Sequence, residues 1–152
     1  MGDSELLPSL GGLAVSAFFA ATFLPGTTEA VLAGLVIGTD IEVWLLVTVA
    51  SVFNVAGSGV NYGIGRFLDR FRHSRFMPVA PATLARGRRW FERYGVWSLL
   101  LCWLPVVGDA FPVVAGFMRV PVLVAFPLIA VGKTLRFVAI AWGITAGWSV
   151  VA

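Results

Sequence analysis

The sequence predicts an all-α integral membrane protein: an inverted repeat of two re-entrant helical hairpins, each followed by a transmembrane helix, with an amphipathic basic connector between the repeats. Three observations lead to this fold class. Of the 152 residues, 59% are hydrophobic and only 12% are charged, which is far from the composition of a soluble globular domain. The apolar residues gather into four long runs. Two of these runs are interrupted near their centres by the same pattern of residues.

The four apolar runs cover residues 10–38, 43–65, 94–118 and 120–152. Each is long enough to cross a hydrocarbon layer about 30 Å thick, which takes about 20 helical residues. Only the run 43–65 contains no Asp, Glu, Lys or Arg. The residues ahead of the first run include Asp3 and Glu5 but no basic residue, unlike a secretory signal, so we expect this run to be retained.

The first and third runs share an internal break. In each, an aromatic residue and a leucine precede a proline, and an acidic residue follows four positions later: Glu29 after Pro25, and Asp109 after Pro105. Asn54 lies 29 positions after Pro25, and Lys133 lies 28 positions after Pro105. This spacing indicates a duplicated unit. We expect one membrane domain over residues 1–152, with repeat 1 at about 10–65, the connector at 66–93 and repeat 2 at about 94–152.

A straight helix through either break is disfavoured, because proline lacks a backbone donor and clashes with the preceding turn. If each broken run returns to the side from which it entered, 43–65 is the one full crossing between the halves, and they are inverted. The alternative is four complete crossings with parallel halves. Hairpins place Arg119 on the cytoplasmic side and four crossings place it outside, so the positive-inside rule favours hairpins.

The connector is strongly basic, since eight of the 11 Lys and Arg residues fall between Arg66 and Arg93. We expect it to face the cytoplasm. Phe91 and Tyr94 recur at helical spacing with charged residues between them, which predicts a helix on the membrane surface with Thr83 as its N-cap. Its arginines are expected to set the topology and to face lipid headgroups. These residues are Arg86, Arg88, Arg89 and Arg93.

Four charged residues lie well inside apolar runs, namely Glu29, Asp109, Lys133 and Arg136. On insertion scales each costs about 2.5 to 3.5 kcal/mol in hydrocarbon unless it is paired or faces water. Two acids and two bases balance, and Lys133 and Arg136 share a helical face. The sequence therefore predicts a polar cluster at mid-depth, in which Glu29 or Asp109 exchanges a proton while Lys133 and Arg136 hold an anionic group.

The uncharged run 43–65 carries a stripe of small polar residues at helical spacing. Such a stripe serves equally well to line a cavity or to bond neighbouring helices together, and the spacing leaves both roles open. We expect Asn54 and Asn61 to border the same pathway as the four charges, with the two prolines at its breaks. The stripe consists of Ser51, Asn54, Ser58 and Asn61.

Several kinds of chemistry are not expected. There is no Ser/His/Asp or Cys/His set, and His73 is alone in the basic connector, so the chain does not resemble a hydrolytic enzyme. Cys102 is the single cysteine and lies in an apolar run, where packing is its expected role. We expect no metal site, no cofactor and no nucleic acid partner, because the anionic membrane surface accounts for the basic stretch.

The chain resembles the DedA superfamily, also described as SNARE-associated Golgi or VTT-domain proteins, and its short YqaA-like branch in particular. The resemblance covers roughly residues 18–142. The residues that carry it are Phe23-Leu24-Pro25 to Glu29, Asn61-Tyr62-Gly63-Ile64-Gly65-Arg66, Arg93-Tyr94-Gly95, Trp103-Leu104-Pro105-Val106-Val107-Gly108-Asp109, Ala115-Gly116 and Gly132-Lys133-x-x-Arg136.

The resemblance implies re-entrant hairpins in the bacterial inner membrane and movement of a phospholipid or polyprenyl phosphate between leaflets, linked to the proton gradient. The larger branch carries arginines around the second-hairpin proline, where this chain has Cys102 and Gly108, and an acid after the first Pro-Gly, where it has Thr27. Lys133 and Arg136 would supply the positive charge instead. Two other functions stay open, a proton-coupled exporter of a small anion or metal and a membrane scaffold that transports nothing. A homo-oligomer is also compatible with so small a chain.

Overall fold

The computed structural model describes residues 3–21, 26–70, 81–104 and 108–151. Within this part of the chain every regular element is a helix. The elements are α1 (Asp3–Ala20), α2 (Thr27–Gly38), α3 (Val43–Asp69), α4 (Pro81–Tyr94), the 3₁₀-helix η1 (Gly95–Trp103), α5 (Ala110–Phe117) and α6 (Val122–Val151).

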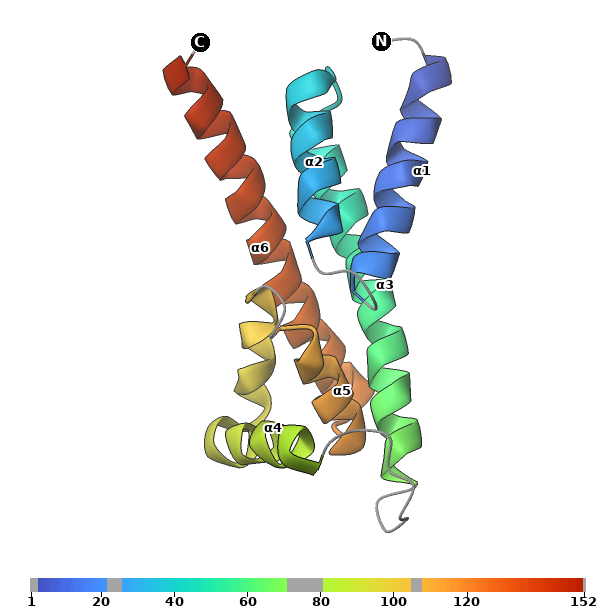
Figure 1. Ribbon diagram of the computed structural model, residues 1–152, viewed down its shortest axis with the longest axis vertical. Coiled ribbons are helices and arrows are strands. Elements are labelled where there is room, and N and C mark those ends of the chain that lie inside the picture. The colour runs from blue at the N-terminus through green and yellow to red at the C-terminus, as the bar shows by residue number, and fades with distance from the viewer. Residues whose placement is uncertain (1–2, 22–25, 71–80, 105–107, 152) are drawn as a thin grey trace.

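Two long helices form the frame of the molecule (Figure 1). α3 and α6 run along most of its length, α1 and α2 lie beside them at the end that holds both termini, and η1 and α5 lie at the other end. α4 lies across that second end, roughly at right angles to the long helices. Of the described helices, Val43–Asp69 and Val122–Gly147 are long and apolar enough to span a membrane, whereas Leu6–Ala20 and Thr27–Gly38 are apolar but shorter.

The two broken runs do not form continuous helices. α1 ends at Ala20 and α2 begins at Thr27, preceded by Gly26 with a φ of 100°, a left-handed conformation that glycine adopts without strain. In the second half, η1 ends at Trp103 and α5 begins at Ala110. The interruptions therefore fall where the sequence predicts them, although Pro25 and Pro105 themselves lie outside the described residues.

The helices do not end where the apolar runs end, and the N-cap expected at Thr83 is wrong. α1 begins at Asp3 rather than near residue 10, and α3 continues past residue 65 to Asp69, so Arg66 is helical. A basic residue is favourable in the last turn of a helix because it opposes the negative end of the helix dipole. α4 begins at Pro81 and not after a cap at Thr83, which agrees with the suitability of proline for the first helical position.

The packing of the helix pairs crosses between the two halves. Each half has a pair of shorter helices, α1 and α2 in the first and η1 and α5 in the second, followed by a long helix. The first member of each pair contacts the long helix of its own half, since α1 packs against α3 and η1 packs against α6. The second member of each pair packs against the long helix of the other half, since α2 packs against α6 and α5 packs against α3. Among the described helices, each half of the chain therefore packs against the other half.

The closest of these contacts is the crossing of α3 and α5. A Cβ atom on Gly65 would collide with the Val113 carbonyl oxygen, and one on Gly116 would collide with the Tyr62 carbonyl oxygen. Glycine at both positions lets the two backbones approach as closely as small residues do in other membrane helix pairs. The Tyr62 hydroxyl also donates to the Val120 carbonyl oxygen at 2.6 Å, just beyond α5.

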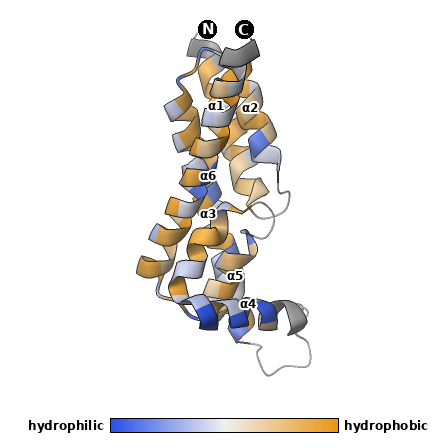
Figure 2. Ribbon diagram, turned by 90° about the vertical axis from the view of Figure 1, so that its left-hand side faces the viewer, coloured by the Kyte–Doolittle hydropathy of each residue, from blue (hydrophilic) through white to orange (hydrophobic). Residues whose placement is uncertain are grey.

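Hydrophilic residues are frequent along α4 at its end of the molecule (Figure 2). Arg86, Arg88, Arg89 and Arg93 are all exposed, and Phe91 is buried against the neighbouring helices. Tyr94 does not share that buried face, because its side chain is 48% exposed and stacks on Trp90 with the ring centres 5.2 Å apart. The arrangement is that of an amphipathic helix with one side against the protein and one side free.

Candidate functional site

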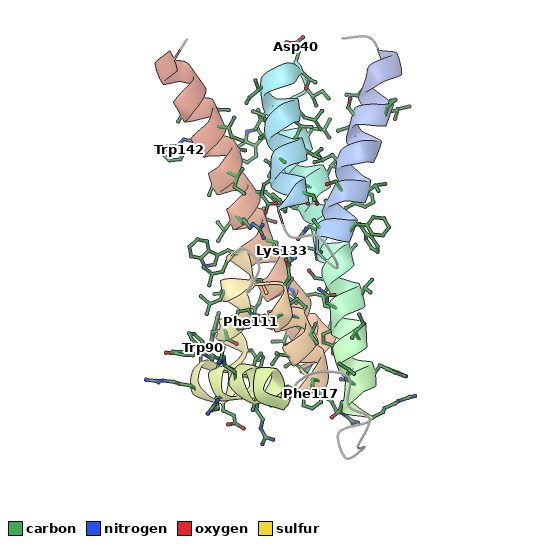
Figure 3. All side chains as sticks on the ribbon, viewed as in Figure 1. Asp40, Trp90, Phe111, Phe117, Lys133 and Trp142 are labelled. Carbon is green, nitrogen blue, oxygen red and sulfur yellow. The ribbon has the colours of Figure 1, made fainter. Side chains whose placement is uncertain are left out.

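Lys133 lies near the middle of α6, between the two ends of the molecule (Figure 3). Its side chain is completely buried, with 0% exposure. The Nζ atom donates to Asn54 Oδ1 on α3 at 2.5 Å and to Asp109 Oδ1, just before α5, at 2.7 Å. The ammonium group therefore has one charged and one neutral partner, supplied by two different elements.

Two asparagines on α3 extend this contact to α1. The Asn54 amide donates to the Ala17 carbonyl oxygen at 2.8 Å, and the Asn61 amide donates to the Ala21 carbonyl oxygen at 2.6 Å. Asn61 also donates to the Asp109 backbone oxygen at 3.3 Å. Ala17 lies in the last turn of α1 and Ala21 directly follows the helix, and the Ala17 carbonyl oxygen also accepts from the Ala21 amide at 3.4 Å. We call the side chains of Asn54, Asn61, Asp109 and Lys133 the Lys133 network.

Arg136 forms a second ion pair one turn further along α6, with Glu29 on α2. Glu29 lies in the first turn of α2, where the helix dipole favours a negative charge. The Arg136 side chain is 10% exposed and that of Glu29 is 23% exposed. The guanidinium group also lies 5.9 Å from the centre of the Phe137 ring. We call this pair and the Lys133 network together the mid-length cluster.

The structure thus brings together all four charged residues that the sequence places at mid-depth. Glu29 meets Arg136 and Asp109 meets Lys133, so each acid has its own base. Removing one partner of such a buried pair leaves an uncompensated charge and typically costs about 3–5 kcal/mol. The cluster joins α1, α2, α3, α6 and the start of α5, which come from both halves of the chain.

The small polar stripe on α3 is buried. Asn54 and Asn61 bond other helices, and the Ser58 hydroxyl donates to the Asn54 backbone oxygen at 3.0 Å. Ser51 Oγ is buried and has no hydrogen-bond partner within the described residues. Two of the four residues therefore bond a neighbouring element, Ser58 bonds within α3, and Ser51 leaves the cavity-lining role open.

Other predicted residues lie away from the cluster. The connector arginines Arg86, Arg88, Arg89 and Arg93 belong to α4 at the end of the molecule, where Arg88 pairs with Glu92 at 2.7 Å. Pro25, Pro105 and His73 lie outside the described residues. Among the residues that the structure does describe, no group of three or more His, Cys, Asp or Glu side chains has the arrangement of a metal site.

The sequence interpretation did not anticipate the ion pair between Asp69 and Arg119. Arg119 Nε contacts Asp69 Oδ2 at 2.5 Å and joins the end of α3 to the turn between α5 and α6. Asp69 is almost fully buried, whereas Arg119 is exposed and has a φ of 57°, which is unusual for a residue other than glycine. The available signal was that both residues lie just outside the ends of apolar runs, at the same end in the hairpin arrangement.

The chain is similar to membrane proteins along nearly its whole length. The family model for the VTT domain matches residues 24–145. The inner membrane protein YqaA of Escherichia coli is 38% identical over 138 residues, which cover 91% of this chain and 92% of the relative. An uncharacterized protein of Haemophilus influenzae is 34% identical over 139 residues, covering 87% of this chain and 85% of the relative.

A further similarity is partial. Undecaprenyl phosphate transporter A of Staphylococcus aureus is 31% identical over 71 residues, which cover 46% of this chain and 34% of the relative. No solved structure matches the chain.

Proposed function

Since the chain belongs to the VTT-domain (DedA) family and to its YqaA-like branch, we propose that this inner membrane protein moves a lipid or a polyprenyl phosphate between leaflets. The mid-length cluster would bind the anionic headgroup. The partial relative named as an undecaprenyl phosphate transporter supports a lipid phosphate as the cargo.

The main observation that supports the proposal is that two ion pairs lie at mid-length, Asp109–Lys133 and Glu29–Arg136. Charges at this depth are costly and are characteristic of ion or substrate pathways in membrane proteins. Here Lys133 is fully buried, and both basic side chains come from α6, while the acids come from helix pairs at opposite ends of the molecule. A change in either ion pair would therefore alter how one helix pair contacts α6.

The helix pairs themselves are proposed to be re-entrant hairpins in an inverted repeat. Three features support this plan: α1 and α2 approach the cluster from one end, η1 and α5 approach it from the other, and α3 is the long apolar helix between them. The Asp69–Arg119 contact is a fourth, because it keeps Arg119 at the same end as the basic connector. Inverted repeats with broken helices meeting at mid-depth are common among transporters.

A proton would be exchanged at Glu29 or Asp109 during the cycle. Protonation removes the negative charge and with it the attraction that holds the acid to Arg136 or Lys133. The freed basic group would then be open to an anionic headgroup, which couples proton movement to binding. A carboxylate can take up and release a proton in this step, whereas an amide of the same shape cannot.

The proposal is tested with purified protein in vesicles that contain a fluorescent polyprenyl phosphate or phospholipid. A membrane-impermeant quencher reports how much label remains in the inner leaflet. We expect the wild type to accelerate exchange between leaflets, and Glu29→Gln and Asp109→Asn to abolish it at equal protein content. Thr145→Val, an exposed change on the same long helix as Lys133, is the matched control and should behave as the wild type.

Three outcomes would count against the proposal. Full exchange activity in both acid variants would show that the two carboxylates are not needed for lipid movement. Movement of an enclosed small anion or metal without movement of labelled lipid would identify an exporter. A wild type that moves neither, together with normal physiology of cells that carry the acid variants, would identify a scaffold.

A further inference from the structure

The two basic residues of the mid-length cluster are held in different ways. Lys133 has 0% exposure and two fixed partners on two elements. Those partners are themselves fixed, since Asn54 bonds α1 and the Asp109 backbone oxygen accepts from Asn61. An ammonium group has three donors, and two of them are already committed within this network.

Within the part of the chain that the structure describes, Arg136 forms one ion pair, with Glu29 of α2, and its side chain is more exposed than that of Lys133. The Arg136 side chain is 10% exposed and that of Glu29 is 23% exposed, although the Glu29 carboxylate oxygens themselves are buried. A guanidinium group has five N–H donors, and one carboxylate occupies at most two of them. Even a bidentate contact with Glu29 therefore leaves N–H donors of Arg136 that Glu29 does not use. The planar guanidinium group can bind two phosphate oxygens in the same bidentate way.

From this difference we infer that Arg136 is the residue that contacts the phosphate group of the substrate, in exchange for Glu29, and that Lys133 is a positioning residue. This inference rests on the proposed function and divides its charged residues into two roles. Release of Glu29 breaks one partly exposed ion pair between α2 and α6. Release of Lys133 breaks a buried network that joins α1, α3, α6 and the start of α5.

The division of roles predicts which helix moves. When phosphate replaces Glu29 at Arg136, α2 loses its charged contact with α6, while the Lys133 network continues to hold the remaining elements. The carboxylate of Glu29 acts as a competitor for the phosphate. Its removal should tighten phosphate binding, because the fraction of protein with an available Arg136 rises.

The test measures binding to the full-length protein in detergent micelles, with dodecyl phosphate as the probe and dodecanol and inorganic phosphate as controls. Binding is read as the shift in Tm with probe concentration. We expect Glu29→Gln to bind dodecyl phosphate several-fold more tightly than the wild type, and Asp109→Asn to stay within about twofold of it. Adding Arg136→Gln to Glu29→Gln should abolish the shift.

A second, charge-balanced variant separates positioning from contact. Asp109→Asn combined with Lys133→Gln removes both charges of the Lys133 network at once, so no charge is left unpaired. We expect its starting Tm and its maximal rate of lipid exchange to fall while its affinity for dodecyl phosphate is retained. If this variant does not fold, the tighter binding expected of Glu29→Gln and the nearly unchanged binding expected of Asp109→Asn still decide the matter.

The inference is overturned if Glu29→Gln weakens binding, or if loss of Lys133 abolishes binding as completely as loss of Arg136. It is also overturned if vesicles show lipid exchange while no protein binds dodecyl phosphate, and in that case the proposed function survives. An equal shift with inorganic phosphate supports the role of Arg136 but counts against a lipid as the cargo. Absence of both binding and lipid exchange removes the two proposals together.

Discussion

Lys133 shows at the scale of one residue how an apolar helix accommodates a positive charge. The ammonium group is buried among helices, yet its contacts with Asn54 and Asp109 provide one neutral and one negative oxygen. Asn54 has a second role in this arrangement, because its amide also donates to the Ala17 carbonyl oxygen of α1. A polar side chain that satisfies two buried groups at once is costly to replace with an apolar one.

The first stability prediction concerns Asn54→Leu. This change keeps the approximate volume but removes one hydrogen bond to a charged group and one to a backbone carbonyl, so we expect a loss of about 2 to 3 kcal/mol in the free energy of unfolding. Reversible unfolding in mixed micelles measures it. Thr48→Val on the same helix is the control, since Thr48 is exposed and should change stability by less than about 0.5 kcal/mol. Similar losses for both variants would contradict the role of Asn54.

At the scale of elements, the exchange of partners between the two halves decides the packing. α5 contacts α3 more extensively than it contacts α6, the helix that directly follows it in sequence. Gly65 and Gly116 make this crossing close enough for backbone contact. In a bilayer, where lipid chains are as apolar as the side chains, such close fit is a main source of attraction between helices.

The prediction at this scale concerns glycine. Gly65→Ala should destabilise the protein by about 1 to 3 kcal/mol, because the added methyl group forces the α3 and α5 backbones apart. Gly63→Ala on the same helix has open space at the added methyl group and gains the higher helix propensity of alanine, so it should be neutral or stabilising by up to about 1 kcal/mol. The unfolding assay used for Asn54 distinguishes the two. A stable Gly65→Ala variant would show that the crossing is looser than described.

On the scale of the whole molecule, charge is separated along the long axis. Asp40 and Glu42 precede α3 at the end that holds both termini, and the arginines of α4 lie at the other end. The distribution gives the molecule one basic end, which the positive-inside rule assigns to the cytoplasm. The mid-length cluster lies between the two ends, and paired charges attract most strongly where they are buried away from water.

The corresponding prediction is a topology. Single cysteines near the N-terminus, at Thr39, at Arg119 and near the C-terminus are introduced into a Cys102→Ala background and treated with an impermeant thiol reagent in intact cells. With re-entrant hairpins, Thr39 and both termini should react from outside and Arg119 should not. Four complete crossings would instead expose Thr39 and Arg119 and protect both termini, so a single labelling series distinguishes the two plans.

The sequence alone was sufficient for the all-α membrane class and the two helix interruptions, and it singled out the four charged residues that form ion pairs at mid-length. Hydrophobic composition is not compatible with a soluble fold, proline disfavours a straight helix, and charge inside an apolar run demands a partner. These are local properties, and each can be recognised in one stretch of chain. The helix ends at Asp3, Asp69 and Pro81 were less well predicted, because an apolar run need not end where its helix ends.

Only the tertiary structure decided which acid meets which base. Lys133 and Arg136 are one turn apart, so either could pair with Glu29 or Asp109 by sequence spacing. The choice follows from α2 packing on α6 and from α5 packing on α3, which brings Asp109 to Lys133 beside Asn54. The Asp69–Arg119 contact arises in the same way, from two segments 50 residues apart. Such contacts depend on distances through space, which the order of residues along the chain does not specify.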